Sequence, residues 1–415
     1  MSIGPLFDAV TGRVPAVAEL QGLYGPFTFP EKLLQKIWFR GDFDRSRATT
    51  LDGRRVRIQH GGRWNLLGGP DFKGARLRIG EEMEMTGDVE LHLHAGDWQT
   101  HGHASDAAYD GVVLHVVLFP PAIGHITRGA GGREIPVLAL LPLLHHDLEE
   151  YAADESVETM ANRPAAHIIE RLGPMSQAEL AALIERHATE RWRQKVHFAR
   201  LRVRRLGWDE ACHQTALEIL GYRFNRAPML RIATAHPLGE WAAASFNSDA
   251  IFAAEKAGWS LQGLRPANHP RVRLGQYATW VHTQPQWPEK LTELMPRPPV
   301  VAADTVTGDA RRTASFTRLR SEWSVAICGD IFSGGTRWDT LLCDGFLPLL
   351  AARAEGAELQ GVWYHWFCGD LPPLLPRALR QLQIFSGRAR PACHGAAQGL
   401  LGWLIECERT AAMPN

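Results

Sequence analysis

The sequence predicts an α+β protein with a mixed α/β N-terminal domain and a mainly α-helical C-terminal half. Apolar and polar residues alternate with a period of two at several places between residues 56 and 93, as in half-buried strands. Beyond residue 153 the apolar residues recur at helical spacing. A chain of 415 residues also exceeds one ordinary domain. We therefore predict domains at residues 1–152, 153–300 and 301–415.

The first predicted helix begins near Thr28. Thr28 has the position of an N-cap, Pro30 lies in the first turn, and Glu31 completes a capping box. Gly41 is expected to end this helix. Its buried face would comprise Leu33, Leu34, Ile37 and Trp38.

Four strands are expected to follow this helix. The first three contain alternating apolar residues, whereas the last is almost continuously apolar, as in a central strand buried on both faces. A short helix is predicted at Ser105–Tyr109, before the last strand, and a further strand at Ile135–Leu141. The four strands would include residues 56–58, 75–79, 89–93 and 112–119.

Composition excludes several classes of protein. The 45 basic and 45 acidic residues give a formal net charge of zero, so overall charge indicates neither a nucleic-acid nor a membrane partner. The longest apolar stretches are too short to span a bilayer, and we expect no membrane association. None of the six cysteines forms a C-x-x-C pair. They are expected to be free thiols of a cytoplasmic protein.

A basic segment is predicted on a long helix that opens with a capping box at Ser176 and Glu179. One interpretation is a solvated face around an apolar stripe. The other is contact with the phosphate backbone of a nucleic acid, which positions the nucleic acid without reading its sequence. The residues concerned are Arg191, Arg193, Lys195, Arg200 and Arg204.

The chemistry of the chain is concentrated between Asp71 and His115. Successive strand side chains point to opposite faces, so Asp88, Glu90, His92 and His94 share one face of a predicted strand. One interpretation is a phosphodiesterase that uses Mg²⁺ or Mn²⁺, which requires carboxylates placed close together. Asp71 and Glu90 would meet across the sheet if their strands are neighbours.

The predicted order of helix, three strands, short helix and strand resembles the PD-(D/E)XK nuclease core, also called restriction-endonuclease-like. Pro70-Asp71 and Glu90-Leu91-His92 occupy the positions of its motif. The resemblance implies Asp71 and Glu90 as metal ligands, with the Leu91 carbonyl completing the inner sphere. His92 stands where that family has lysine and would orient or deprotonate the attacking water.

A second interpretation is a site for Zn²⁺, Mn²⁺ or Fe²⁺ built from histidines, since two imidazoles in His-x-His can reach one metal and carboxylates can complete the shell. The candidate ligands are His92, His94, His101, His103, Asp106 and His115. His115 also lies in this stretch, but a hydrogen-bonded core histidine is the expected role for it. A third interpretation is purely structural, with the polar strand face solvated or hydrogen-bonded. Residues expected to line the cleft or support the ligands are Glu31, Asn65, His94, His101, His103 and Asp106.

Several motifs spread over most of the chain carry a second resemblance. They include Gly68–Phe72, Gly87–His92, Asp97-Trp98, His101–His103, Leu114–Val117, Arg265–Asn268 and Gln398–Leu401. With these motifs the chain resembles an uncharacterised bacterial family, the domain-of-unknown-function family numbered twenty-eight fifty-one. The resemblance implies membership of that family without implying an activity.

The sequence thus predicts, first, a nuclease-like enzyme acting on DNA or RNA with Mg²⁺ or Mn²⁺. Its catalytic residues would be Asp71, Glu90 and His92. The alternatives are a non-catalytic nucleic-acid-binding or scaffold protein on a degenerate nuclease core, and a zinc or manganese hydrolase that uses the histidines.

Overall fold

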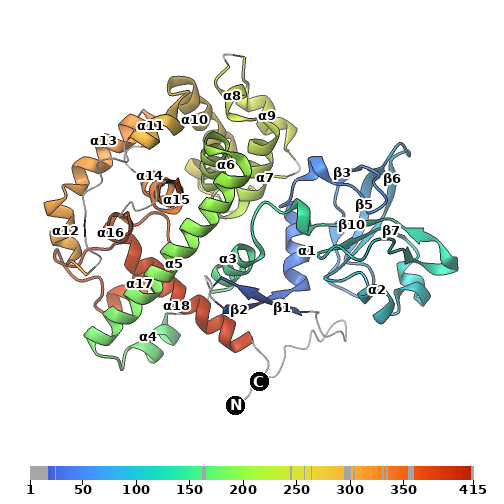
Figure 1. Ribbon diagram of the computed structural model, residues 1–415, viewed down its shortest axis with the longest axis horizontal. Helices are drawn as coiled ribbons and strands as arrows, with labels where there is room; N and C mark the ends of the chain where they lie inside the picture. The colour runs from blue at the N-terminus through green and yellow to red at the C-terminus, as the bar shows by residue number, and fades with distance from the viewer. Residues whose placement is uncertain are drawn as a thin grey trace. The chain divides into compact units, whose positions relative to one another are not determined.

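β-structure and α-structure are separated along the chain. The structure is a computed structural model, and its chain divides into two compact units, Met1–Ala152 and Ala153–Asn415 (Figure 1). The first unit contains a mixed sheet and the second is helical, which confirms the predicted coarse fold class. A further division of the helical half near residue 300 stays a prediction. The structure describes residues 17–23, 25–160, 165–243, 245–256, 258–262, 264–293, 301, 304–329, 331–332, 335–353 and 359–412.

The main sheet of the first unit has strand order β10-β7-β6-β5-β3, and β4 pairs with β5 (Figure 1). β3, β4 and β6 each run antiparallel to β5, whereas β6, β7 and β10 run parallel to one another. The strands are β3 (Val56–His60), β4 (Arg63–Trp64), β5 (Phe72–Ile79), β6 (Met85–His92), β7 (Val112–Val117) and β10 (Val137–Ala139).

A crossover joins the parallel strands β6 and β7, because such strands cannot be linked by a tight hairpin. It consists of α2 (Asp97–Thr100) and two 3-10 turns, η2 (His103–Ser105) and η3 (Ala107–Tyr109). The single short helix predicted at 105–109 is thus replaced by three brief elements. The crossover brings His101 and His103 back toward His92 at the end of β6.

The N-terminal helix is α1 (Glu31–Arg40), and Thr28 does not cap it. Thr28 instead lies in β2 (Gly25–Pro30), which pairs with β1 (Val17–Gly22), so Pro30 becomes the N-cap residue. The predicted capping box is therefore wrong, because the helix begins at Glu31 and Thr28 lies two residues before the N-cap position. Gly41 ends the helix with a φ of 60°, as the sequence predicts.

The two faces of the sheet have different environments. On one face Phe72, Leu77, Val89 and Leu91 join α1 in the hydrophobic core of this unit. Strand alternation turns Glu90 and the residues that share its parity to the opposite face. Around this sheet lie η1 (Arg45–Arg47), β8 (Thr127–Arg128), η4 (Ala130–Gly132), β9 (Glu134–Ile135) and η5 (Leu141–Leu143).

The second unit is built on α5 (Gln177–Leu206), whose predicted capping box between Ser176 and Glu179 is present. Among its described residues, six tryptophans are fully buried: Trp241, Trp280, Trp287, Trp338, Trp363 and Trp366. Among the described residues, no helix combines the length and the apolar character needed to cross a bilayer.

The remaining helices of the chain begin with α3 (Leu148–Met160), α4 (Ala166–Leu172), α6 (Trp208–Leu220), α7 (Tyr222–Ala235), α8 (Leu238–Trp241), α9 (Ser248–Ala254) and the 3-10 turn η6 (Pro266–Asn268). Then follow α10 (Pro270–Thr283), α11 (Trp287–Glu293), α12 (Thr307–Thr313), α13 (Phe316–Cys328) and α14 (Arg337–Thr340). The last are the π-helix η7 (Leu341–Phe346), α15 (Leu347–Arg353), α16 (Gln360–His365), α17 (Leu374–Gln381) and α18 (His394–Ala412).

One buried histidine makes the stability of the helical unit depend on pH. Nε2–H of His213 donates to the His236 carbonyl (3.0 Å), and the Tyr277 hydroxyl donates to Nδ1 (2.7 Å). Both nitrogens are therefore satisfied in the neutral ring. Burial lowers the pKa of His213 from 6.5 to about 4.

We predict that His213 destabilises the fold in acid. Its folded pKa lies below its unfolded pKa, so its stabilising contribution is complete above pH 6.5 and is lost as pH falls toward 4. The loss approaches about 1.4 kcal/mol per pH unit. Urea unfolding at pH 7 and pH 5 should show a smaller pH dependence for His213→Gln than for the natural protein. Equal pH dependence of the two proteins would contradict this assignment.

Candidate metal centre

Asp71 and Glu90 are joined through backbone N–H groups, with each carboxylate accepting from the other's segment of chain. The backbone N–H of Asp71 donates to Oε2 of Glu90 (3.0 Å), and the N–H of Leu91 donates to Oδ2 of Asp71 (3.1 Å). Nε2 of Gln35, on α1, donates to Oδ1 of Asp71 (2.8 Å). These contacts fix the start of β5 against the end of β6. They leave Oε1 of Glu90 turned toward a group of imidazoles.

Asn65 sets the loop that delivers Asp71. Its Nδ2 donates to the carbonyls of Pro70 (2.9 Å) and Gly68 (3.2 Å), and its Oδ1 accepts from the N–H of Leu67 (3.2 Å). The N–H of Asn65 also donates to the Asp71 carbonyl (2.7 Å). Asn65, predicted to line the cleft or support the ligands, therefore closes the loop that leads into Asp71.

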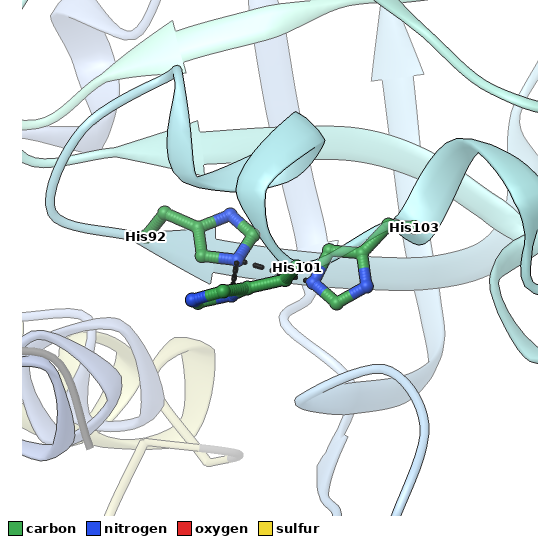
Figure 2. Close-up of side chains that lie close together, drawn as sticks. All are labelled: His92, His101 and His103. Carbon is green, nitrogen blue, oxygen red and sulfur yellow. Dashed lines mark hydrogen bonds between the residues drawn. The ribbon is translucent and has the colours of Figure 1, made fainter. Parts of the chain in front are cut away.

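Three imidazoles converge beside Glu90 (Figure 2). Nε2 of His92 lies 3.1 Å from Nδ1 of His101 and 3.2 Å from Nε2 of His103. Oε1 of Glu90 lies 3.2 Å from Nε2 of His103 and 3.6 Å from Nε2 of His92. The ligand atoms of the three histidines all lie within 4.8 Å of one another. His92 comes from β6, and the other two histidines come from the crossover.

These separations fit a divalent cation. Metal–nitrogen bonds of about 2.1 Å in tetrahedral geometry place neighbouring ligand atoms about 3.4 Å apart. Four of the six separations between these ligand atoms range from 3.1 to 3.6 Å, and the three imidazole nitrogens all lie within 4.8 Å of one another. A ring nitrogen also has one proton or one lone pair, so Nε2 of His92 cannot make good hydrogen bonds to two imidazoles at once. Lone pairs that converge on one cation resolve this conflict.

A second layer of polar groups orients His92. Its Nδ1 lies 2.9 Å from Nε2 of His115, whose Nδ1 lies 2.9 Å from Oγ1 of Thr127. Nε2 of His125 reaches the same hydroxyl at 3.2 Å. Burial lowers the pKa of His115 to about 3, so its ring is neutral. When Nδ1–H of His92 donates to His115, Nε2 of His92 keeps its lone pair toward the cluster.

Aromatic rings hold the imidazoles in place. Tyr109 stacks on His103 with ring centroids 3.8 Å apart, and Trp98 packs edge-on against His103 at 5.2 Å. Nε1 of Trp98 donates to the Arg128 carbonyl (2.9 Å). Trp98 and Tyr109 are buried, whereas His101 is exposed. The cluster is therefore enclosed on the aromatic side and reaches solvent at His101.

Other predicted site residues lie outside the converging group. His94 is exposed and stacks on Phe119 at 4.9 Å. Asp106 caps η3 by accepting from the N–H of Ala108 (2.9 Å). Glu31 is the first residue of α1.

The basic residues of α5 are only partly on the surface. Nζ of Lys195 forms an ion pair with Oδ1 of Asp344 (2.7 Å), and Nη1 of Arg191 donates to Gln194 (3.2 Å). Arg193 and Arg204 are exposed, and Arg200 is half-buried. Lys195 is thus engaged within the helical unit.

His115 and Thr127 form the hydrogen-bond network behind His92. The sequence offered His115 as a candidate ligand and favoured a hydrogen-bonded core histidine, whereas nothing in the sequence singled out Thr127. The register pairs Glu90 with His115 on neighbouring parallel strands, so their side chains share a face. Knowing that β6 pairs with β7, and in which register, would have placed the His115 side chain on the same face as Glu90.

The mixed sheet of the first unit thus bears a cluster of three histidines and one carboxylate. The chain belongs to the family described as "Protein of unknown function (DUF2851)", whose model matches residues 31–254. That span includes α1, the main sheet and every residue of the cluster. No curated protein and no solved structure gives a significant match.

We predict that His115 sets metal affinity through His92. Replacing the ring by His115→Phe removes the acceptor for Nδ1–H of His92 and should weaken Zn²⁺ binding about 10–100-fold. His94→Phe is the matched control, because His94 lies outside the cluster. The His94→Phe protein should bind Zn²⁺ as tightly as the natural protein. Competition with a chromophoric chelator measures both. A folded His115→Phe protein with natural Zn²⁺ affinity would refute this role.

Proposed function

We propose that the protein is a divalent-metal-dependent hydrolase that cleaves phosphodiester bonds in DNA or RNA. Glu90, His92, His101 and His103 would hold the cation. The observation that carries the proposal is the convergence of three imidazoles, whose ligand atoms lie within 4.8 Å of one another, with Oε1 of Glu90 3.2 Å from His103 and 3.6 Å from His92.

The ligand set favours some metals over others. Imidazole nitrogens suit Zn²⁺, Mn²⁺ and Fe²⁺, whereas Mg²⁺ prefers oxygen ligands and retained water. Three imidazoles and one carboxylate oxygen therefore support a zinc or manganese centre over the Mg²⁺ site first expected from Asp71 and Glu90. The proposal places Glu90 in direct contact with the cation. It assigns Asp71 to holding Glu90 through its backbone N–H.

The order of elements supports phosphodiester chemistry. α1 precedes three strands, β3, β5 and β6, that form antiparallel neighbours, and a crossover leads to β7 parallel to β6. Pro70-Asp71 lies at the start of the second of these strands and Glu90 lies on the third. This arrangement is similar to the PD-(D/E)XK nuclease core, with His92 in place of its lysine.

Each residue of the cluster would have a separate role in the proposed reaction. A divalent cation would supply positive charge that offsets charge developing on the phosphate and would acidify an attacking water. The two oxygens of Glu90 have different contacts. Oε2 accepts from the backbone N–H of Asp71, which fixes the carboxylate, and Oε1 faces the imidazoles. His115 fixes the orientation of His92. His101 is exposed, so substrate would approach from its side.

A non-catalytic nucleic-acid-binding protein is the second candidate. The observation in its favour is that Nδ1 of His92 contacts His115, so His92 does not present the mobile positive charge of the lysine it replaces. This candidate predicts binding of nucleic acid with no cleavage in the presence of Zn²⁺ or Mn²⁺.

Metal content separates the roles of the two acids. Protein purified without chelator should contain about one Zn²⁺ or Mn²⁺ per chain. Glu90→Gln removes a negative ligand and should lower metal affinity at least about tenfold. Asp71→Asn keeps an acceptor for the N–H of Leu91 and should retain the metal. Plasma emission spectrometry measures the content. Loss of metal in Asp71→Asn but not in Glu90→Gln would overturn this assignment.

Cleavage is the direct test of the proposed activity. Metal-loaded protein should hydrolyse a labelled oligonucleotide, and His103→Ala should lower the rate at least about 100-fold because one ligand is lost. His94→Ala is the control, since it removes an imidazole outside the cluster. Binding without cleavage by the natural protein, with DNA and RNA and both metals, would favour the second candidate.

A further inference from the structure

The sheet face that carries Glu90 and His92 continues onto β5 and β3, where it is rich in arginine. Val56 pairs with Ile79, and Ile58 pairs with Leu77, toward the hydrophobic core. The residues between them therefore point to the opposite face. On that face Arg57 is the cross-strand partner of Arg78, and His60 is the partner of Arg76.

The same face reaches the metal centre. Arg76 pairs with Thr86 of β6, and Thr86 has the same parity as Glu90 and His92 along that strand. Cross-strand neighbours Arg63 and Lys73 add two further cations at the β4–β5 edge, and both are exposed. Lys73 is two residues from Asp71. Basic side chains thus extend from the distal end of β5 to the loop beside the cluster.

Like charges face each other at two places on this surface. Arg57 lies opposite Arg78, and Arg63 lies opposite Lys73; such pairs destabilise a sheet when nothing neutralises them. Arg57 and Arg76 are exposed, and Arg78 is half-buried.

Nearby acids are turned to other partners. Nε of Arg78 donates to the Glu82 carbonyl (3.0 Å), while the Glu82 carboxylate pairs with Arg54 (2.9 Å). Glu84 accepts from Gln59 (3.2 Å). Within the described part of the chain, no carboxylate forms an ion pair with Arg57, Arg76 or Arg78. The charge on this face is therefore available to an external anion.

We propose that this surface is a basic platform that binds the phosphate backbone of a nucleic acid and leads it to the metal centre. It comprises Arg57, Arg63, Lys73, Arg76 and Arg78. The strands hold these side chains in a fixed array, and guanidinium groups match phosphate oxygens in geometry. Contacts of this kind position a nucleic acid without reading its sequence. The identity of the polyanion rests on the proposed function.

The platform replaces α5 as the expected surface for nucleic acid. On α5, Lys195 pairs with Asp344, and Nη1 of Arg202 pairs with Glu218 (2.8 Å). Those ion pairs neutralise part of the positive charge that the sequence predicts for the surface of this helix. The arginines of β3 and β5 have no comparable acidic partners among the described residues, and they lie in the unit that carries the cluster.

Binding measured without metal tests the platform independently of catalysis. Fluorescence anisotropy with a labelled DNA duplex, in EDTA, compares Arg57→Gln/Arg76→Gln/Arg78→Gln with the natural protein. The control is Arg193→Gln/Arg200→Gln/Arg204→Gln on α5, which removes the same charge. We expect the platform variant to bind at least about tenfold more weakly. Its plot of log affinity against log salt should lose about 2 to 3 units of slope, near 0.9 per lost phosphate contact.

The outcomes separate this inference from the proposed function. Natural affinity in a folded platform variant, or an equal loss in the α5 control, would overturn the platform. Binding of vesicles with anionic lipid in preference to DNA and RNA would also overturn it. A platform variant that fails to bind DNA, together with no cleavage by the natural protein, would support the platform and reject the hydrolase.

Discussion

Burial of a carboxylate among imidazoles is the constraint on which the N-terminal unit depends. Glu90 has 2% of its surface exposed and His92 has 1%, and Trp98 of the crossover packs edge-on against His92. An unpaired buried charge costs several kcal/mol, so these groups must be neutralised or bonded on every side. The sheet register, the loop closed by Asn65 and the crossover turns all supply partners to this small volume.

The parallel pairing of β6 and β7 makes that arrangement possible. A hairpin would have placed the chain between them in a tight turn, whereas the parallel pair requires a crossover long enough to carry His101 and His103 back over the sheet. The same pairing sets His115 beside Glu90. The parallel pairing therefore gathers clustered imidazoles from a strand and from a polar connection, and also places His115, which hydrogen-bonds to His92.

Much of the sheet could be predicted because strand periodicity is local. The alternation in β3, β5 and β6 and the apolar run of β7 appear in the sequence without any knowledge of pairing. The closeness of Asp71 and Glu90 followed from assuming that their strands are neighbours. By contrast, the role of His115 depends on register, and that of Thr127 on a contact from outside the main sheet. Neither the strand register nor the contact made by Thr127 can be read from sequence periodicity.

Errors arose where tertiary contacts override a local pattern. Thr28 and Glu31 have the spacing of a capping box, yet pairing of β1 with β2 takes Thr28 into a strand. Lys195 belongs to a basic run on α5, yet its ammonium pairs with Asp344 of the π-helix. A run of charge along one helix therefore says little about the charge available at the surface. On β3 and β5 the basic residues are separated in sequence, and only cross-strand register brings them together. Surface charge that depends on register is hidden from a search for charge runs, which explains why the sequence directed attention to the helix instead of the sheet.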